Sequence, residues 1–227
     1  MKVPILKIPF DRDDTTEICR ELTDLLLSGR LAMGQKVREF ETKFQQFVGS
    51  AYALGTSNGT TALEVIFRSL SDFISQGQNQ SQPPDRSQAF GRSQPPGQTQ
   101  WSVAVPSNTF MASCLAPIAA GFKIILIDCD PVYFQMCPED LARKIQPTTR
   151  AVLLVHNGGF ISPDWTQIKS IAEKNNSVLI EDAAHAHGAE IDGRQAGTLG
   201  LAGAFSFYPT KVLTTAEGGM VVTSDQK

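Results

Sequence analysis

The sequence has little of several features that would mark particular protein classes. It holds four cysteines without a Cys-x-x-Cys pair, so neither a disulfide framework nor a zinc site is indicated. Its 20 Lys and Arg residues against 23 Asp and Glu residues argue against a nucleic-acid partner. No run approaches the roughly 20 apolar residues that span a bilayer, and Lys7 and Pro9 interrupt the start where a signal peptide would need continuity. We therefore expect a cytoplasmic protein with free thiols, no nucleic-acid partner and no membrane partner.

One segment has a composition unlike the rest of the chain. Residues from about 75 to 100 are rich in Gln, Ser, Pro and Gly, and Ser-Gln-Pro-Pro occurs twice, at Ser81 and Ser93. Such a segment cannot bury enough apolar surface to offset the entropy lost on ordering. The composition predicts a disordered surface insertion. A Pro-rich binding site is the alternative, but no P-x-x-P pattern is present.

The remaining sequence predicts an α/β fold. Apolar periodicity predicts helices at 15–28 and 36–48, and a third helix that begins near Thr60. Short apolar runs at 103–105, 124–127, 151–155 and 178–180 alternate with helical patterns at 111–120, 138–145 and 164–175. Two further strand-like runs lie at 204–207 and 219–223. Near-continuous apolar strands separated by helices indicate a mostly parallel sheet flanked by helices.

In such folds ligands bind beyond the carboxyl ends of the strands, so polar residues there are the candidates for function. Gly59 and Thr60 lie in a Ser-Asn-Gly-Thr-Thr turn that leads into the third predicted helix. Free N–H groups and the helix dipole suit such a start to phosphate binding. An ordinary N-cap made of hydroxyl residues is the alternative.

Asp182 ends a predicted buried strand, where a carboxylate needs a partner such as a protonated pyridine nitrogen. An acidic cap on a following helix is the alternative. His185 and His187 follow closely, and a His-x-His metal site is an alternative interpretation of this pair. No third ligand lies nearby in the sequence, so we expect no metal.

Lys211 closes the segment Phe-Ser-Phe-Tyr-Pro-Thr-Lys, which runs from a predicted strand into a polar turn. A lysine held in an apolar pocket or near other cations loses basicity and can act as a nucleophilic amine. Ser206 and Thr210 could donate hydrogen bonds to a phosphate. A solvated loop lysine is the alternative, since lysine is mostly exposed. Phe110 could stack on a planar ring or belong to the core.

These candidates together match the needs of pyridoxal phosphate. That cofactor requires an amine for its aldehyde, a carboxylate that keeps the ring nitrogen protonated, and a phosphate cup. Each element is weak alone, and their order along one α/β chain is much more specific.

The motifs resemble those of a known family. Residues 57–63, 106–110, 181–189 and 205–211 are similar to the motifs of the DegT/DnrJ/EryC1/StrS aminotransferases, which are fold-type I pyridoxal-phosphate enzymes. The resemblance covers nearly the whole chain except the 75–100 segment. The chain departs from the family pattern at Val212, where asparagine is common. It also departs at 157–159, where Asn-Gly-Gly replaces a loop that usually contains an aromatic residue.

The resemblance implies a role for each candidate. Lys211 would bind the cofactor covalently and then move a proton, and Asp182 would contact the pyridinium nitrogen. His185 would lie beside the ring and Phe110 on its face. Gly59, Thr60 and Ser206 would hold the phosphate.

The resemblance also implies an activity and an organisation. The expected reaction is amination of a nucleotide-linked keto-sugar with an amino-acid donor such as glutamate, in a homodimer. Residues 1–227 would form the large cofactor-binding domain, with helices at 15–48 and the C-terminal small domain missing. Lysine at 211 favours transamination, because relatives that dehydrate sugars have histidine there.

Three alternatives remain at this point. The first is a truncated, non-catalytic homologue that binds the cofactor weakly or partners a full-length relative. The second is a pyridoxal-phosphate enzyme with another reaction, such as a sugar dehydratase. The third, a dinucleotide-binding enzyme, is disfavoured because no G-x-G-x-x-G follows the first predicted strand.

Overall fold

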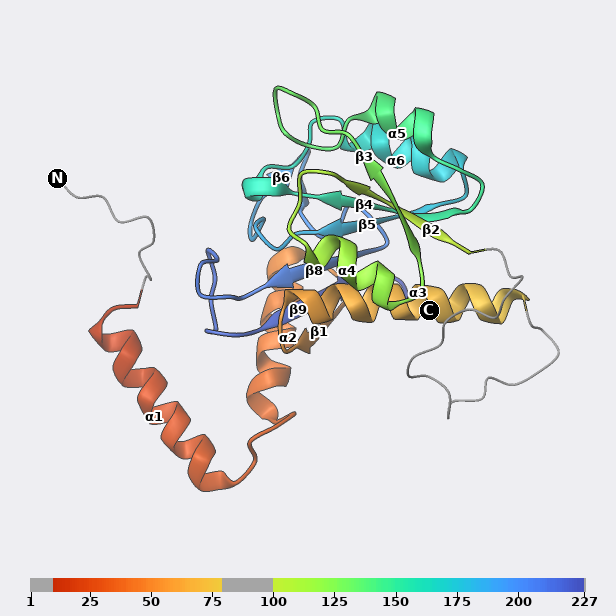
Figure 1. Ribbon diagram of the computed structural model, residues 1–227. Coiled ribbons are helices and arrows are strands. Elements are labelled where there is room, and N and C mark those ends of the chain that lie inside the picture. Colours follow the sequence, from red (N-terminus) through yellow and green to blue (C-terminus); the bar gives the residue numbers. More distant parts are fainter. Residues whose placement is uncertain (1–9, 79–99, 227) are drawn as a thin grey trace.

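A seven-stranded sheet forms the centre of the computed structural model, which describes residues 10–78 and 100–226 (Figure 1). The strands are β1 (Tyr52–Thr56), β2 (Ser102–Pro106), β3 (Lys123–Ile127), β4 (Thr149–Val155), β5 (Val178–Asp182), β8 (Ala202–Ser206) and β9 (Gly219–Thr223). Their order across the sheet is β1-β9-β8-β5-β4-β2-β3. Only β9 runs antiparallel to its neighbours in this sheet, so the other strands share one direction.

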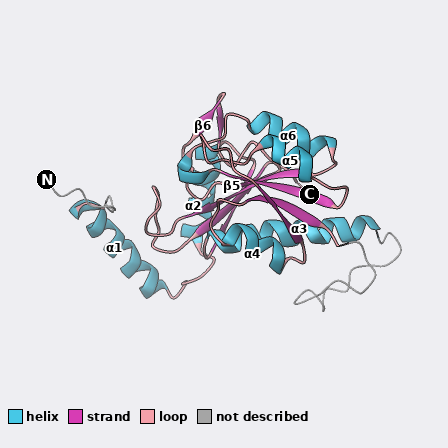
Figure 2. Ribbon diagram, turned by 45° about the horizontal axis from the view of Figure 1, so that its top comes forward, coloured by secondary structure: helices cyan, strands magenta, loops and turns pink. Residues whose placement is uncertain are grey.

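Helices cover both faces of the sheet. They are α2 (Gln35–Val48), α3 (Gly59–Gln78), α4 (Ala112–Ala119), α5 (Pro138–Lys144) and α6 (Trp165–Lys174). Figure 2 shows α5 and α6 on one side of the strands and α3 and α4 on the other. The inner strands β2, β4 and β5 are covered on both faces, so most of their side chains are apolar in both directions, which explains the continuous apolar runs in the sequence.

Two apolar cores lie on the two faces of the sheet. Leu63, Phe67 and Ala116 of α3 and α4 pack on one face. Phe44 of α2 and Ile168 of α6 pack on the other face. The predicted fold class, a mostly parallel sheet flanked by helices, is confirmed.

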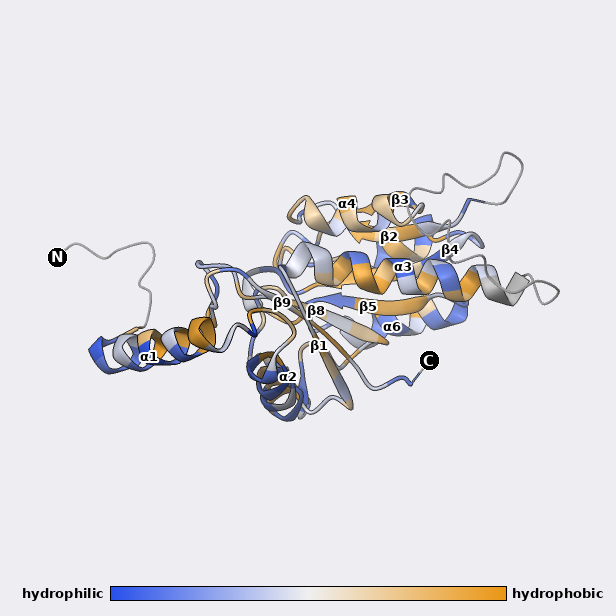
Figure 3. Cartoon of the chain, turned by 90° about the horizontal axis from the view of Figure 1, so that it is seen from below, coloured by the Kyte–Doolittle hydropathy of each residue, from blue (hydrophilic) through white to orange (hydrophobic). Residues whose placement is uncertain are grey.

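The first helix, α1 (Arg12–Ser28), lies apart from this body (Figure 1). Asp11 caps it by accepting hydrogen bonds from the N–H groups of Asp13 and Asp14, so it begins three residues before the predicted start at residue 15. The apolar periodicity correctly predicts a helix, but none of its residues is buried. Figure 3 shows hydrophilic and hydrophobic residues mixed along α1.

The other predicted elements are present with small changes at their ends. The expected helix from near Thr60 is α3, and it continues through Gln78. The predicted insertion at 75–100 therefore falls mostly outside the described residues. Four of the elements in the described residues were not predicted: strand β1, the two strands of the hairpin, β6 (Glu190–Ile191) and β7 (Arg194–Gln195), and the 3-10 helix η2 (Asn157–Gly159). Within the described ranges, none of the helices has an apolar stretch long enough for a bilayer span.

Candidate functional site

The candidate residues lie at or just after the carboxyl ends of parallel strands, on the side of the sheet where these strands end. Asp182 is the last residue of β5, Ser206 is the last residue of β8, and Phe110 lies four residues after β2. The start of α3 follows β1, which runs in the same direction. The sheet thus brings together segments that are distant in the sequence (Figure 1).

Asp182 is buried and held by hydrogen bonds. Its side chain is 6% exposed, and Oδ2 accepts a hydrogen bond from Ser113 Oγ at 2.7 Å. Oδ1 accepts from the backbone N–H of Ala184 at 3.2 Å. Ser113 is in turn 2.7 Å from Thr109 Oγ1. These contacts stabilise a carboxylate in a place with little water.

Lys211 is half-buried beside this carboxylate. Burial lowers the pKa of the Lys211 amine, and the charge of Asp182 opposes that shift. The turn that presents Lys211 is fixed by Phe207, whose N–H donates to Gly218 and whose carbonyl oxygen accepts from Thr215. A desolvated amine of lowered pKa is the form of lysine that acts as a nucleophile.

The two histidines lie near Lys211 in different surroundings. Burial, followed by the charge of Lys211, lowers the pKa of His185, whose Nδ1 accepts a hydrogen bond from the N–H of Gly158 at 3.3 Å. Burial lowers the pKa of His187 to about 4. Its ring packs against Phe44, Phe205 and Phe207. No group of three or more potential metal ligands gathers in the part of the chain that the structure describes.

The start of α3 lies against Ser206. A Cβ built on Gly59 would come within 2.7 Å of Ser206 Cβ, so glycine is needed for this approach. Asn58 caps the helix, with Oδ1 accepting from the N–H of Thr61 at 2.8 Å. The N–H groups of Gly59 and Thr60 precede this first bond and belong to the unpaired helix start, beside the Ser206 hydroxyl.

Phe110 is exposed, so the interpretation as a core residue is wrong. Its side chain is 76% accessible, and that of the neighbouring Met111 is 62% accessible. This large aromatic side chain, in the loop between β2 and α4, leaves an apolar face open to solvent. Such a face is able to cover a planar ligand.

Two features of the site were missed by the sequence reasoning. The first is Ser113, the hydroxyl that donates to Asp182; its signal was a hydroxyl one helical turn after Thr109 in an otherwise apolar helix. The second is the fully buried pair of Glu181 and His156, joined at 2.8 Å. Glu181 also accepts from three backbone N–H groups, those of Gly197, Leu199 and Gly200. Apart from its position directly before Asp182, nothing in the sequence indicated that Glu181 has these buried partners.

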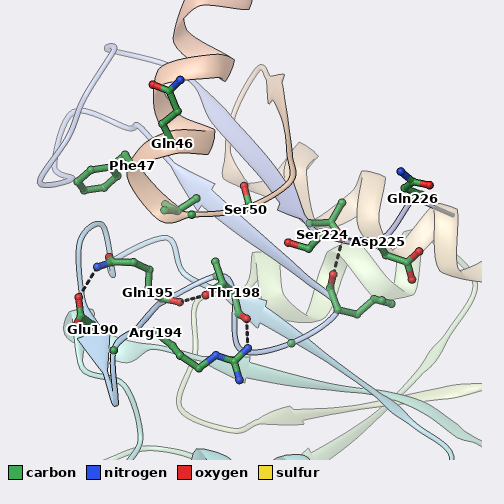
Figure 4. A pocket seen from close by; sticks show the side chains of 17 residues that line it. Gln46, Phe47, Ser50, Glu190, Arg194, Gln195, Thr198, Ser224, Asp225 and Gln226 are labelled. Atoms are coloured by element: carbon green, nitrogen blue, oxygen red, sulfur yellow. Dashed lines mark hydrogen bonds between the residues drawn. The ribbon is translucent and has the colours of Figure 1, made fainter.

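A hollow lies elsewhere on the molecule (Figure 4). It is bordered by the end of α2, the β6–β7 hairpin and the residues that follow β9, among them Gln46, Arg194 and Ser224. None of the candidate residues lines it, and its polar side chains bond one another, as Glu190 does with Gln195. The candidate site is therefore the region around Asp182 and Lys211, at the carboxyl ends of the parallel strands.

Comparison with protein families gives one match over most of the chain. Residues 12–79 and 96–227 match the DegT/DnrJ/EryC1/StrS aminotransferase family. The break at 80–95 lies within the segment of biased composition.

Individual relatives and structures agree with this match. The chain is 32% identical over 97% of its length to a dTDP-3-amino-3,4,6-trideoxy-alpha-D-glucose transaminase of Micromonospora megalomicea subsp. nigra, of which it covers 52%. It is 36% identical over 92% of its length to a dTDP-3-amino-3,6-dideoxy-alpha-D-galactopyranose transaminase of Aneurinibacillus thermoaerophilus, of which it covers 51%. An aminotransferase structure from Psychrobacter cryohalolentis superposes with a TM-score of 0.78 at 32% identity, covering 98% of this chain and 50% of that one. The chain thus spans about half the length of the relatives it matches.

Proposed function

The chain belongs to the DegT/DnrJ/EryC1/StrS aminotransferase family, and on that premise we propose that it binds pyridoxal phosphate and aminates a nucleotide-linked keto-sugar. The amino group would come from an amino-acid donor such as glutamate. Residues 1–227 would be the large cofactor-binding domain, working in a homodimer. The observation that carries the proposal is the desolvated amine of Lys211 beside the buried carboxylate of Asp182.

The residues at the site fit this cofactor. An amine of lowered pKa, a buried carboxylate and an open helix start occur together at one edge of the sheet. Bound pyridoxal phosphate would supply an aldehyde that condenses with amines and a ring that withdraws electrons from the attached carbon. The two relatives named above are transaminases of dTDP-linked amino sugars, which supports the proposed substrate class.

Each residue would have a distinct task. Lys211 Nζ would bind the aldehyde and, when released, accept and return a proton. Asp182 would hold a proton on the ring nitrogen, since a buried carboxylate favours a cationic partner. The N–H groups of Gly59 and Thr60 and the hydroxyl of Ser206 would bind the phosphate. Phe110 would cover one face of the ring and exclude water from it.

The first experiment tests the covalent site. The protein is purified with pyridoxal phosphate, freed of excess cofactor, examined by visible absorbance, reduced with borohydride and mapped for label. We expect a visible band and label on Lys211, and neither in Lys211→Ala. Lys123→Ala, at the exposed start of β3, is the matched control and should keep both.

The same sample tests the reaction. Addition of glutamate or glutamine should change the band, and a dTDP- or GDP-linked keto-sugar should then restore it. A folded protein that gives no band would contradict the proposal and favour the non-catalytic homologue. If the band forms but stays the same when glutamate or glutamine is added, the result would support the cofactor site and contradict the transaminase activity.

A further inference from the structure

The turn Asn157–Gly159 lies directly against His185 through two backbone contacts. The N–H of Gly158 donates to His185 Nδ1 at 3.3 Å. A Cβ built on Gly159 would lie 2.7 Å from the carbonyl oxygen of His185. Gly158 and Gly159 have φ angles of +66° and +81°, in the left-handed region that glycine adopts readily. The two glycines thus allow an approach that larger residues would obstruct.

The turn is anchored by other parts of the site. The carbonyl oxygen of Asn157 accepts a hydrogen bond from Nε2 of the buried Gln135 at 3.2 Å. The N–H of Gly159 donates to His156, whose own N–H donates to the carbonyl oxygen of Asp182 at 3.0 Å. The turn is therefore tied to the end of β5, where Asp182 lies. Its N–H groups are held in place before any ligand arrives.

We propose that Asn157–Gly159 is a positioning turn that fixes the imidazole of His185 in the tautomer with its proton on Nε2. A ring nitrogen that accepts a hydrogen bond carries no proton, so in the neutral ring the other nitrogen carries it. The hydrogen bond to Gly158 is the one that His185 makes within the described residues. Nε2–H is thus left as a donor for a ligand.

Burial of the His185 ring, together with the charge of Lys211, favours the neutral imidazole, which makes its tautomer matter. Burial and then Lys211 lower the pKa of His185, while Asp182 opposes them. His187, the other titratable group close to His185, has a pKa lowered to about 4 and is neutral at pH 7. A neutral imidazole offers one donor and one acceptor, and the turn decides which nitrogen has which role.

The inference rests on the proposed function only for the identity of the ligand that would accept the Nε2 proton. The tautomer itself belongs to the protein without cofactor, so it is measured there. The chain has three histidines, which makes assignment of their imidazole nitrogens by histidine-specific labelling practical.

The test is long-range proton–nitrogen correlation NMR of the 15N-histidine-labelled protein at pH 8. We expect the His185 signals to show a protonated Nε2 and an unprotonated Nδ1. Gly158→Val replaces a left-handed glycine with a β-branched residue that disfavours this conformation, which displaces the N–H. Loss of one hydrogen bond of typical net strength should change the tautomer ratio about tenfold.

Two controls separate positioning from general damage. Gly158→Asn keeps the N–H, adopts left-handed φ more readily than other side chains do, and has open space for its Cβ, so it should keep the tautomer. Gly193→Val imposes the same strain at φ +72° in the β6–β7 turn and should also keep it. A mixed or Nδ1-protonated His185 in the unsubstituted protein would overturn the proposal, as would an unchanged ratio in Gly158→Val.

Cofactor binding, measured on the same protein, distinguishes failure of the positioning turn from failure of the proposed function. If His185 has the expected tautomer but the protein gives no visible band with pyridoxal phosphate, the proposed function fails and the positioning turn stands. If the band forms and the tautomer is wrong, the positioning turn fails alone. Where both hold, Gly158→Val should bind the cofactor more weakly than Gly158→Asn does.

Discussion

The hydroxyl of Ser113, in α4, donates a hydrogen bond to the side chain of Asp182 at the end of β5. Ser113 is fully buried in α4, and its Oγ lies 2.7 Å from both Asp182 Oδ2 and Thr109 Oγ1. The hydroxyl donates to the carboxylate and accepts from the threonine, so a three-residue chain runs from the loop after β2 to the end of β5. Such chains orient a carboxylate as well as stabilise its charge.

Ser113→Ala should therefore weaken cofactor binding more than it weakens the fold. Removing one donor to a buried carboxylate costs about 1–3 kcal/mol, which corresponds to a loss of roughly 5-fold to 150-fold in the affinity for a group that depends on Asp182. The dissociation constant of pyridoxal phosphate, measured by absorbance titration, checks this expectation.

Ser102→Ala is the matched control for that variant. Ser102 is also buried and bonds a threonine, Thr149, but it lies at the start of β2, away from the site. Equal losses of cofactor affinity in both variants would show that Ser113 acts through the fold alone. An unchanged affinity in Ser113→Ala would show that Asp182 does not need this donor.

The sequence yields candidates for the site where residue types with a recognised chemical task follow predicted strands. Lys211, Asp182 and Gly59 each have an ordinary alternative, and only their order along one α/β chain makes them candidates for a single cofactor site. Ser113 and Gly158 were not found, because their tasks depend on contacts with residues 69 and 27 positions away. No local pattern encodes such a contact.

At the scale of elements, Asp140 joins α5 to the edge strand β3. Its carboxylate is 4% exposed and accepts hydrogen bonds from Lys144 Nζ and from the backbone N–H of Asp128, both at 2.7 Å, and one from Arg143. Lys144, followed by the N–H of Asp128, lowers the pKa of Asp140 from 3.8 to about 2. The same Lys144 donates to the carbonyl oxygen of Leu126 in β3, which occupies part of an otherwise unpaired strand edge.

Asp140 should make the stability of the fold depend on pH in the acid range. Because the pKa in the folded chain lies below the usual value, its contribution to stability is complete above about pH 4 and is lost as the pH falls towards 2. Asp140→Asn should lower the melting temperature at pH 7. The difference in melting temperature between this variant and the unsubstituted protein should become smaller as the pH falls from about 4 towards 2.

The measurement is the melting temperature as a function of pH, with Asp24→Asn as the control. Asp24 lies on the exposed surface of α1, where its ion pair with Arg20 contributes little. A difference between Asp140→Asn and the unsubstituted protein that stays constant from pH 5 to pH 2 would contradict the assignment.

Strands were predictable where they are buried on both faces, because burial on both faces gives a continuous apolar run in the sequence. The parallel strands β2, β4 and β5 are apolar along most of their length, so their positions follow from the sequence within about two residues. Strand β1, by contrast, reads Tyr-Ala-Leu-Gly-Thr, contains a glycine and lies at an edge. Its pairing with β9 joins residues more than 160 positions apart, which no local pattern reveals.

At the scale of the whole molecule, α1 is the part that the central sheet does not support. Ile18, Leu22 and Leu26 lie on the helix with 48%, 51% and 59% of their surfaces exposed. Its N-cap stabilises only the start of the helix, and an exposed ion pair joins Glu21 to Lys36 of α2. A helix of 17 residues without tertiary packing is marginal in water, because most helical stability in proteins comes from burying one face.

Hydrogen exchange should therefore separate α1 from the rest of this chain. We expect amides of α1 to be protected less than about tenfold relative to an unfolded peptide, because local opening there costs little free energy. Amides of β4, whose residues Ala151 to Leu154 are fully buried, should exchange only through global unfolding. Leu22→Ser should leave the melting temperature unchanged, whereas Leu153→Ser should lower it by many degrees.

The outcome of that experiment also tests whether α1 is covered in solution. Protection of α1 equal to that of β4 would contradict the expectation, since it requires an apolar surface over Ile18, Leu22 and Leu26. If the protection fell on dilution, that surface would be a second copy of this chain, because an intramolecular contact is independent of concentration. Exchange that is fast at every concentration would leave the sheet and the helices α2 to α6 as the stable unit, with the candidate site built entirely upon it.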